Sequence, residues 1–242
     1  MLKTEFRKLF ASLFKHDEKY VEIVKALASR SVGMTREELL AAMPSPCGGE
    51  ISRYLLELEE CGFIRRNSII GTIKRGAIYK LIDNFTLFHF KFLAERRGTD
   101  ERFWSLSYEK PALNAWRGLS FERICFWHIP QIKQALGISG VLSDVYSWRG
   151  KSAAPEVGDV QIDMLIDRSD RIINICEMKF SNDEYVMDAD EGRKMRRRIE
   201  LFRSATKTRK GLMPTMISCY GLKRNANSAM IQSVITLDDL FK

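Results

Sequence analysis

Glu177 and Lys179 interrupt the apolar segment IINICEMKF, residues 172–180. The β-prone residues of this segment predict a strand, and side chains two positions apart on a strand lie on the same face. A carboxylate and an ammonium group therefore project together from a strand that is otherwise suited to burial. Such a pair either takes part in the chemistry of a charged ligand or forms a structural ion pair.

The segment just before this strand supplies a second carboxylate, Asp163. The sequence VQIDMLIDRSDRIINICEMKF contains two β-prone runs joined by a short polar turn, which predicts a hairpin. If the turn is centred on Asp170, residues whose numbers sum to 340 face each other, and Asp163 lies opposite Glu177. Opposed side chains are about 5 Å apart, although a shift of register by one residue would change the pairing.

Two opposed carboxylates repel each other, and a divalent cation that binds both removes the repulsion. Magnesium prefers oxygen ligands, keeps several waters, and takes one or two carboxylates. Water bound to a metal ion loses a proton readily and can attack phosphorus. Lys179 would orient this water or stabilise the developing negative charge. The pattern predicts a magnesium or manganese site for phosphodiester hydrolysis, with Asp163 and Glu177 as ligands.

The second half of the chain has the elements to position such a site. Its pattern predicts an α/β (α+β) domain with a mixed central sheet over residues 111–242. The predicted elements are a helix over 112–136, strands over 141–148, 160–167 and 172–180, a basic helix over 185–206, a strand over 214–220 and a closing segment over 233–241.

The predicted basic helix is the most positively charged part of the chain. On it, cations far outnumber the two glutamates Glu191 and Glu200. Because the helix follows the strand of Glu177 and Lys179, its cations could bind phosphates beside the metal, or they could form an ordinary solvated face. The candidate nucleic-acid-binding residues here are Arg193, Lys194, Arg196, Arg197, Arg198 and Arg203.

Residues 17–83 have a different pattern, in which three helices precede a hairpin. Thr35 and Glu38 have the spacing of a capping box at the start of the second helix. The arrangement resembles a winged helix-turn-helix, whose wing would place Lys74 and Arg75 on phosphates. The third helix carries four glutamates against the single Arg53, which suits a DNA groove poorly. Sequence reading by this unit, as in a transcription regulator, and a docking or spacer role both remain open.

Two further segments flank these domains. Residues 1–16 predict an amphipathic helix, with Phe6, Leu9, Phe10, Leu13 and Phe14 on one face, or the tail of a preceding domain. Residues 84–110 begin with an aromatic stretch that predicts a connecting helix packed between the domains, followed by a linker.

The bulk composition fits a globular protein with a polyanionic partner. The chain has 242 residues, of which 45% are hydrophobic, and a formal net charge of +8. No apolar run reaches the roughly 18 residues of a membrane span, so we expect no membrane partner. The five cysteines are dispersed, which favours buried reduced thiols in a cytoplasmic protein.

The residues above resemble the PD-(D/E)XK nuclease superfamily. Its signature is an aspartate on one strand and Glu-x-Lys on the next, matched here by Asp163, Glu177 and Lys179. Its core order of helix, three strands, helix and strand matches residues 112–220. A glutamate of the first helix often joins the site, and Glu122 is the corresponding residue. The resemblance implies Asp163, Glu177 and Glu122 as metal-site residues and Lys179 as a catalytic residue.

Nearly the whole chain is also similar to the C-terminal half of a family of prokaryotic and archaeal-type AAA ATPases. The similarity lies in EFRKLFASLF, GMTREELL, LEECGFIRR, VQIDMLIDR and INICEMKFS. It implies a DNA-directed nuclease-like domain that works with an ATPase domain missing from this sequence. No G-x-x-x-x-G-K-[ST] motif occurs, so we expect no ATP site here. The alternative is a catalytically inactive module that binds DNA or protein; the oligomeric state is left open.

Overall fold

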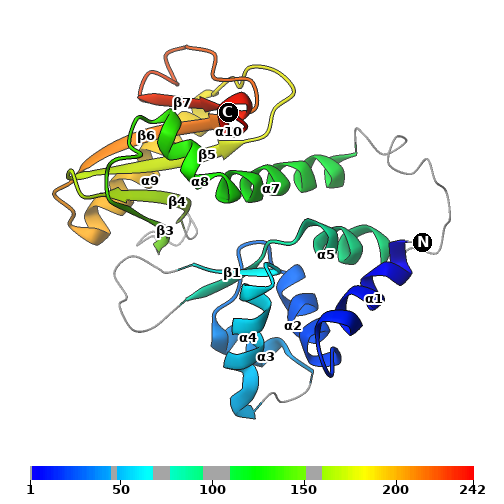
Figure 1. Ribbon diagram of the computed structural model, residues 1–242. Coiled ribbons are helices and arrows are strands. Elements are labelled where there is room, and N and C mark those ends of the chain that lie inside the picture. The colour runs from blue at the N-terminus through cyan, green and yellow to red at the C-terminus, as the bar shows by residue number, and fades with distance from the viewer. Residues whose placement is uncertain (1, 45–47, 68–76, 95–109, 151–159) are drawn as a thin grey trace. The chain divides into compact units, whose positions relative to one another are not determined.

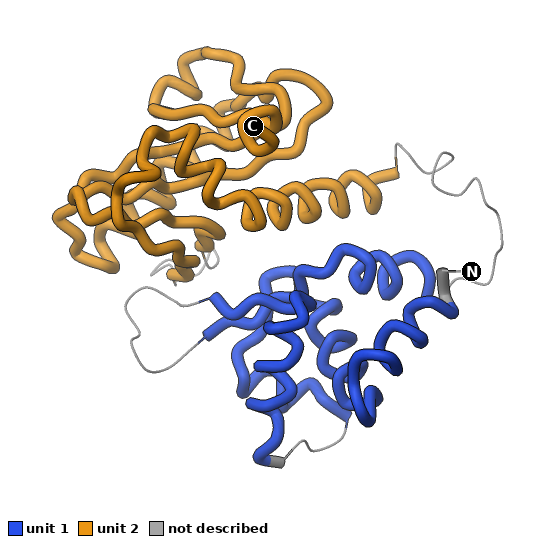
Figure 2. The backbone as a smooth tube through the Cα atoms, viewed as in Figure 1, with its two compact units in different colours: residues 1–68, 74–108 blue, residues 69–73, 109–242 orange. Residues whose placement is uncertain are grey.

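Two compact units divide the chain (Figure 2). The computed structural model describes residues 2–44, 48–67, 77–94, 110–150 and 160–242. Unit 1 comprises residues 1–68 and 74–108, and unit 2 comprises residues 69–73 and 109–242. In the described parts of the chain no helix is long and apolar enough to cross a membrane.

Unit 1 is mainly helical and carries one small antiparallel sheet (Figure 1). Its elements are α1 (Leu2–Leu13), α2 (Glu18–Ala28), α3 (Arg36–Ala42), the 3-10 turn η1 (Gly48–Glu50), α4 (Ile51–Glu60), β1 (Ile64–Asn67), β2 (Ile78–Leu81), α5 (Asn84–Phe88) and the π-helical turn η2 (His89–Leu93). The predicted capping box is confirmed, because Thr35 and Glu38 each accept a hydrogen bond from the other's backbone N–H. The predicted basic hairpin tip with Lys74 and Arg75 lies outside the described residues.

The N-terminal helix belongs to the core of unit 1. Phe6, Phe10 and Phe14 of the predicted apolar face are buried there with side chains of α2 and α4. The inclusion of Leu13 in that face was wrong, because its side chain is 49% exposed. Leu13 lies beside the row of buried phenylalanines on this helix, and its side chain points toward solvent. The aromatic segment of α5 and η2 also packs on this core, through Phe85 and Phe90.

Unit 2 contains a five-stranded sheet, and the prediction that this sheet is mixed is confirmed. Its elements are α7 (Pro111–Trp127), α8 (Ile129–Ala135), β3 (Ser143–Gly150), β4 (Val160–Arg168), β5 (Ile172–Lys179), α9 (Ala189–Thr206), β6 (Gly211–Ser218), β7 (Ser233–Thr236) and α10 (Leu237–Leu240). The spatial order follows the chain order from β3 to β7. The pairs β3–β4 and β4–β5 are antiparallel, whereas β5–β6 and β6–β7 are parallel.

Two of the predicted helices in unit 2 need correction. The single helix predicted over 112–136 is two helices that meet at His128. Pro130, in the first turn of α8, cannot donate a backbone hydrogen bond and disfavours a continuous helix through the preceding residues. The basic helix begins at Ala189 rather than near 185, because the Asp188 carboxylate accepts the Glu191 N–H at 2.8 Å and caps it there.

Different helices pack against the two faces of this sheet. Side chains of α7, α8 and α10 form one apolar cluster with Met164, Cys176 and Ile217. Side chains of α9 form the other cluster with Leu165 and Ile175. The sheet is therefore a middle layer, and the alternation along β5 decides which layer each of its side chains meets.

Candidate functional site

The hairpin register agrees with the prediction along its described pairs. Leu165 faces Ile175 and Ile166 faces Asn174, so the residue numbers of each pair sum to 340. The paired stretch ends at Met164 and Cys176, and one further step in the same register would align Asp163 with Glu177. The backbone thus brings the two carboxylate-bearing positions to neighbouring places on adjacent strands.

The alternation of β4 is broken at Asp163. Ile162 and Leu165 both belong to the cluster under α9, although regular alternation would place them on opposite faces. The β3–β4 register shifts at the same place, which is the mark of a β-bulge. The Asp163 carboxylate accepts a hydrogen bond from the Gln161 amide at 2.5 Å, and its carbonyl accepts one from the Ser147 hydroxyl at 2.7 Å.

Glu177 and Lys179 do lie on one face of β5, as predicted. The Lys179 Nζ is 3.3 Å from a carboxylate oxygen of Glu177. Both side chains line a pocket with a volume of about 130 Å³ between the end of β5 and the first turns of α9. Asp163 is not among the residues that line it. The lining residues are Glu177, Lys179, Tyr185, Met187, Glu191, Lys194, Met195 and Arg198.

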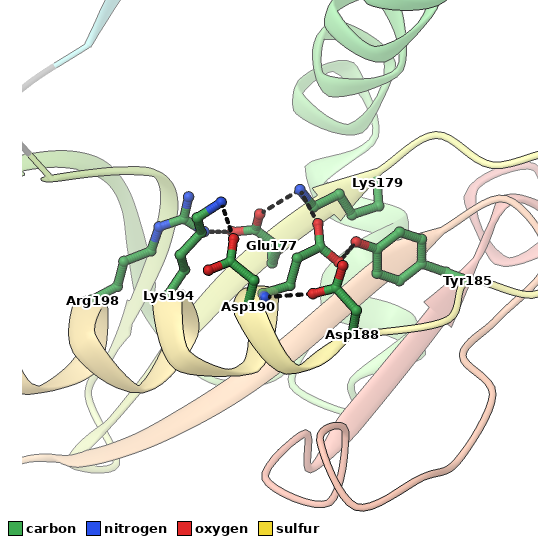
Figure 3. Close-up of polar contacts among 8 residues, drawn as sticks. Glu177, Lys179, Tyr185, Asp188, Asp190, Lys194 and Arg198 are labelled. Carbon is green, nitrogen blue, oxygen red and sulfur yellow. Dashed lines mark hydrogen bonds and ion pairs between the residues drawn. The ribbon is translucent and has the colours of Figure 1, made fainter.

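Helix α9 supplies a second cation that contacts Glu177. The Arg198 guanidinium donates a hydrogen bond to the Glu177 carboxylate oxygen that Lys179 does not contact (Figure 3). The Arg198 and Glu177 side chains are 29% and 20% exposed, so this pair is largely shielded from water. Shielding strengthens the interaction between charges compared with a surface pair. Arg198, predicted as a phosphate-binding residue, is therefore engaged with the acidic group of the site.

Glu191, in the first turn of α9, is the second acidic residue of the pocket. One of its carboxylate oxygens lies 3.2 Å from the Lys179 Nζ, and the other accepts a hydrogen bond from the Tyr185 hydroxyl. Burial lowers the pKa of Lys179, but Glu177 and Glu191 outweigh burial and raise it above 10.5. Burial, followed by the hydrogen bond to Glu191, raises the pKa of Tyr185.

The other predicted phosphate-binding residues of α9 lie nearer to solvent. Asp190 pairs with Lys194 at 2.5 Å and with Arg193 at 3.1 Å, and these bonds lower the pKa of Asp190. Arg196 and Arg203 are exposed, and Arg197 is half-buried. The helix thus presents several cations outward while Arg198 points into the pocket.

Glu122 is not brought into this pocket. It lies on α7, whose buried side chains pack on the sheet face opposite to α9. Burial mainly raises the pKa of the Cys125 thiol, and the charge of Glu122 adds to that effect. The metal role predicted for Glu122 from the resemblance has no support in the pocket lining, and it stays a prediction.

The donor chemistry of the pocket suits a hard divalent cation. Glu177 and Glu191 each have a carboxylate oxygen beside the Lys179 ammonium group, and magnesium is held by one or two carboxylates with waters completing its shell. In the described part of the chain, no group of three or more His, Cys, Asp and Glu is placed to hold a metal ion. A two-carboxylate site is the arrangement that these residues fit.

Glu191 and Tyr185 were missed by the sequence analysis, which counted Glu191 only against the cations of the helix. A signal was present, because Asp188 and Glu191 have the spacing of an N-terminal cap. A glutamate three positions after the cap lies in the first turn, and only nine residues separate β5 from α9. This spacing placed Glu191 in the first turn of the helix that follows the strand of Lys179, and the contact itself depends on how α9 packs on the sheet.

Comparisons with known proteins identify no family for this chain. No family model matches the chain, and no curated protein matches it. Among solved structures, the crystal structure of the protein of unknown function AF1548 is similar at 12% identity, with a TM-score of 0.34. The similarity covers 48% of this chain and 64% of that one.

Proposed function

We propose that unit 2 is a PD-(D/E)XK-type nuclease domain that hydrolyses DNA phosphodiesters with magnesium or manganese. The observation that carries the proposal is the placement of Glu177 and Lys179, which share one face of the central strand and line a polar pocket under the basic helix α9. We propose further that unit 1 is a winged helix and that both units act together with an ATPase domain.

The topology supports this assignment. A helix, three antiparallel strands, a helix and a parallel strand follow one another as α7, β3–β5, α9 and β6, with α8 as an additional short helix after α7. Strand β5 is central, and its C-terminal end carries the Glu-x-Lys pair. Ligands of open sheets gather where strand ends and helix N-termini meet, because there the side chains converge without being buried by the core.

The residues of the pocket would have different roles in the reaction. Glu177 would hold the metal ion, with a second carboxylate from Asp163 or Glu191. When bound, the ion supplies an acidified water and neutralises charge on the phosphoryl oxygens. Lys179 contributes a positive charge near those oxygens. The exposed cations Arg196 and Arg203 of α9 would bind flanking phosphates in any sequence.

One observation favours a second candidate function, a nuclease fold without catalysis that binds DNA or protein. Glu177 is already contacted by two cations, Arg198 and Lys179. A metal ion would have to displace at least one of these contacts, and a carboxylate that is already paired with two cations can belong to the fold alone.

The test is a cleavage assay with the full chain on single- and double-stranded DNA, with and without manganese. We expect metal-dependent cleavage by the wild type, and a loss of at least about 100-fold in Glu177→Gln and Asp163→Ala, whose acidic groups we assign to the metal. Glu200→Gln, an exposed carboxylate elsewhere on α9, is the matched control and should cleave normally.

The two candidate functions predict different results. Salt-dependent DNA binding by the wild type without cleavage under any metal condition would support the non-catalytic module. Cleavage that survives at the wild-type rate in Glu177→Gln would contradict the assigned site. Circular dichroism of each variant separates a lost function from a lost fold.

A further inference from the structure

We infer that unit 2 has a second phosphate-binding surface at the end of its sheet opposite to the pocket, where the turn between β4 and β5 meets the turn between α9 and β6. We call residues 167–171 and 207–210 the turn edge. It binds the backbone of the DNA whose phosphodiester lies at the pocket, so the substrate is a DNA that extends about six base pairs beyond the cleaved bond. This inference rests on the proposed function and deepens it by defining the substrate.

Hydrogen bonds join the two turns of the turn edge. The Gly211 N–H donates to the Arg171 carbonyl at 2.9 Å, and Gly211 pairs with Ile172, the first residue of β5. The Lys210 Nζ donates to the Arg168 carbonyl, also at 2.9 Å. The pocket lies at the other end of β5. The turn edge and the pocket are therefore at opposite ends of one strand.

The two acidic residues of the turn edge are both paired with cations of the same edge. The Asp167 carboxylate accepts a hydrogen bond from the Lys210 Nζ, and the Asp170 carboxylate accepts one from the Arg168 Nε at 2.9 Å. Arg168 is buried, and its guanidinium also donates to the buried Asn174 at 3.4 Å. These contacts neutralise both carboxylates and hold the β4–β5 turn in place.

Three further cations of the turn edge face solvent. Arg171, Lys207 and Arg209 are exposed, and none of the described residues forms an ion pair with them. Arg171 and Lys207 have left-handed backbones, with φ of 67° and 52°, a conformation in which glycine and asparagine are usual. Lys207 suits the dipole at the end of α9, but Arg171 has no such local reason, whereas a role for its charge explains it.

A row of cations connects the turn edge to the pocket. Arg196, Arg203 and Lys207 are exposed and follow one another at spacings of seven and four residues, which places them on one side of α9. Glu200 interrupts the row. Lys194 lines the pocket, and from there to Lys207 the helix rises about 20 Å, at about 1.5 Å per residue. A duplex advances about 3.4 Å per base pair, so the row spans about six base pairs.

This distribution of charge suits a linear polyanion. A single phosphate group would contact a small part of the row, whereas a nucleic-acid backbone presents a phosphate at every step and contacts its whole length. Guanidinium groups bind phosphate oxygens through paired N–H donors, and two of the three exposed cations of the turn edge are arginines. The phosphodiester at the pocket belongs to the same backbone.

The test is DNA binding by the full chain in EDTA, where the proposed cleavage does not occur, measured by fluorescence anisotropy with a labelled duplex of about 20 base pairs. We expect Arg171→Gln/Arg209→Gln to lower the slope of log affinity against log salt by about 1.8, because each phosphate contact with a duplex accounts for about 0.9. Arg171→Lys/Arg209→Lys keeps both charges and should retain most of the slope. Lys15→Gln/Lys25→Gln, at exposed lysines of unit 1, is the charge-matched control. Circular dichroism shows whether each variant is folded.

Equal slopes in the two glutamine variants would overturn the inference. Saturation at two duplexes per wild-type chain would also overturn it, because one continuous surface binds one duplex. Polyglutamate that binds as tightly as DNA of equal charge, and is released by Arg171→Gln/Arg209→Gln, would overturn the assignment to nucleic acid.

The same experiment separates this inference from the proposed function. The expected loss of slope in a protein that cleaves no DNA under any metal condition would support the turn edge and contradict the nuclease function. Cleavage by the wild type, together with an unchanged slope in Arg171→Gln/Arg209→Gln, would contradict the turn edge alone.

Discussion

Individual charges in the pocket of unit 2 are arranged in a chain. Arg198 contacts Glu177, Lys179 bridges Glu177 and Glu191, and Tyr185 closes the series. Each partner is partly shielded from water, so a change at one residue alters the electrostatic environment of the next. The residues of the site should therefore respond to mutation as a group rather than independently.

Tyr185 makes the protein sensitive to alkaline pH. Its pKa is raised above the ordinary value of 10.0, mainly by burial. As pH rises above that value, the unfolded chain loses the phenolic proton while the folded chain keeps it, so the free energy of unfolding falls. We expect Tyr185→Phe to lose less stability than the wild type between about pH 9 and pH 11, measured by urea unfolding.

The control for this comparison is Tyr220→Phe, which removes the same hydroxyl from a side chain that is 60% exposed. An equal decline of stability in the wild type and Tyr185→Phe would contradict the role given to Tyr185.

A single core residue shows whether α1 is part of unit 1. Phe10 is fully buried among aromatic rings, with centroids 4.9 Å from Phe6 and 4.8 Å from Phe63. We expect Phe10→Ala to lower the free energy of unfolding by about 3 to 5 kcal/mol, because it leaves a cavity. Leu13→Ala on the same helix, at a 49% exposed side chain, should cost less than about 1 kcal/mol. Similar losses in both variants would mean that α1 does not pack as described.

At the scale of elements, the sequence was sufficient where local patterns decide the structure. The strand β5, the hairpin register and the capping box at Thr35 all followed from alternation, turn position and cap spacing. Long-range packing could not be predicted from the sequence in the same way. The break of alternation at Asp163 arises from a register shift against β3. The sequence of β4 alone contains no feature that predicts this shift.

The same division between local geometry and long-range packing holds for the candidate site. Glu177 and Lys179 are two residues apart on one strand, so their proximity was a local consequence of strand geometry. Glu191 and Arg198 reach the pocket from α9, and their contacts depend on how that helix lies across the sheet. Such contacts are set by tertiary packing, which composition and spacing do not determine.

Helix α9 should dominate the salt dependence of DNA binding. Arg196 and Arg203 are exposed on it, and each phosphate contact contributes about 0.7 to 0.9 to the slope of log affinity against log salt. The double variant Arg196→Gln/Arg203→Gln should reduce that slope by about 1.4 to 1.8, measured by fluorescence anisotropy at several salt concentrations. Lys15→Gln/Lys25→Gln, at two exposed lysines of unit 1, is the charge-matched control. Equal slopes in both double variants would place the DNA contacts elsewhere.

At the scale of the whole molecule, each unit has its own hydrophobic clusters. The two clusters of unit 2 draw all their residues from the chain after Leu113 and lie on opposite faces of one sheet. We therefore expect residues 110–242, expressed alone, to unfold in one cooperative thermal transition monitored by circular dichroism. A non-cooperative melt would show that unit 2 depends on unit 1 for its stability.

The central claim is that Glu177 holds a catalytic metal ion, and manganese binding to the full chain tests it most directly. We would titrate manganese by calorimetry into the wild type and Glu177→Gln, each with and without a phosphorothioate DNA that resists cleavage. The DNA is included because its phosphates can complete the metal shell and draw Arg198 away from Glu177. We expect saturable binding by the wild type, strengthened by DNA, and binding at least about tenfold weaker in Glu177→Gln. No manganese binding by the wild type in the presence of DNA, or equal binding by the two proteins, would contradict the claim.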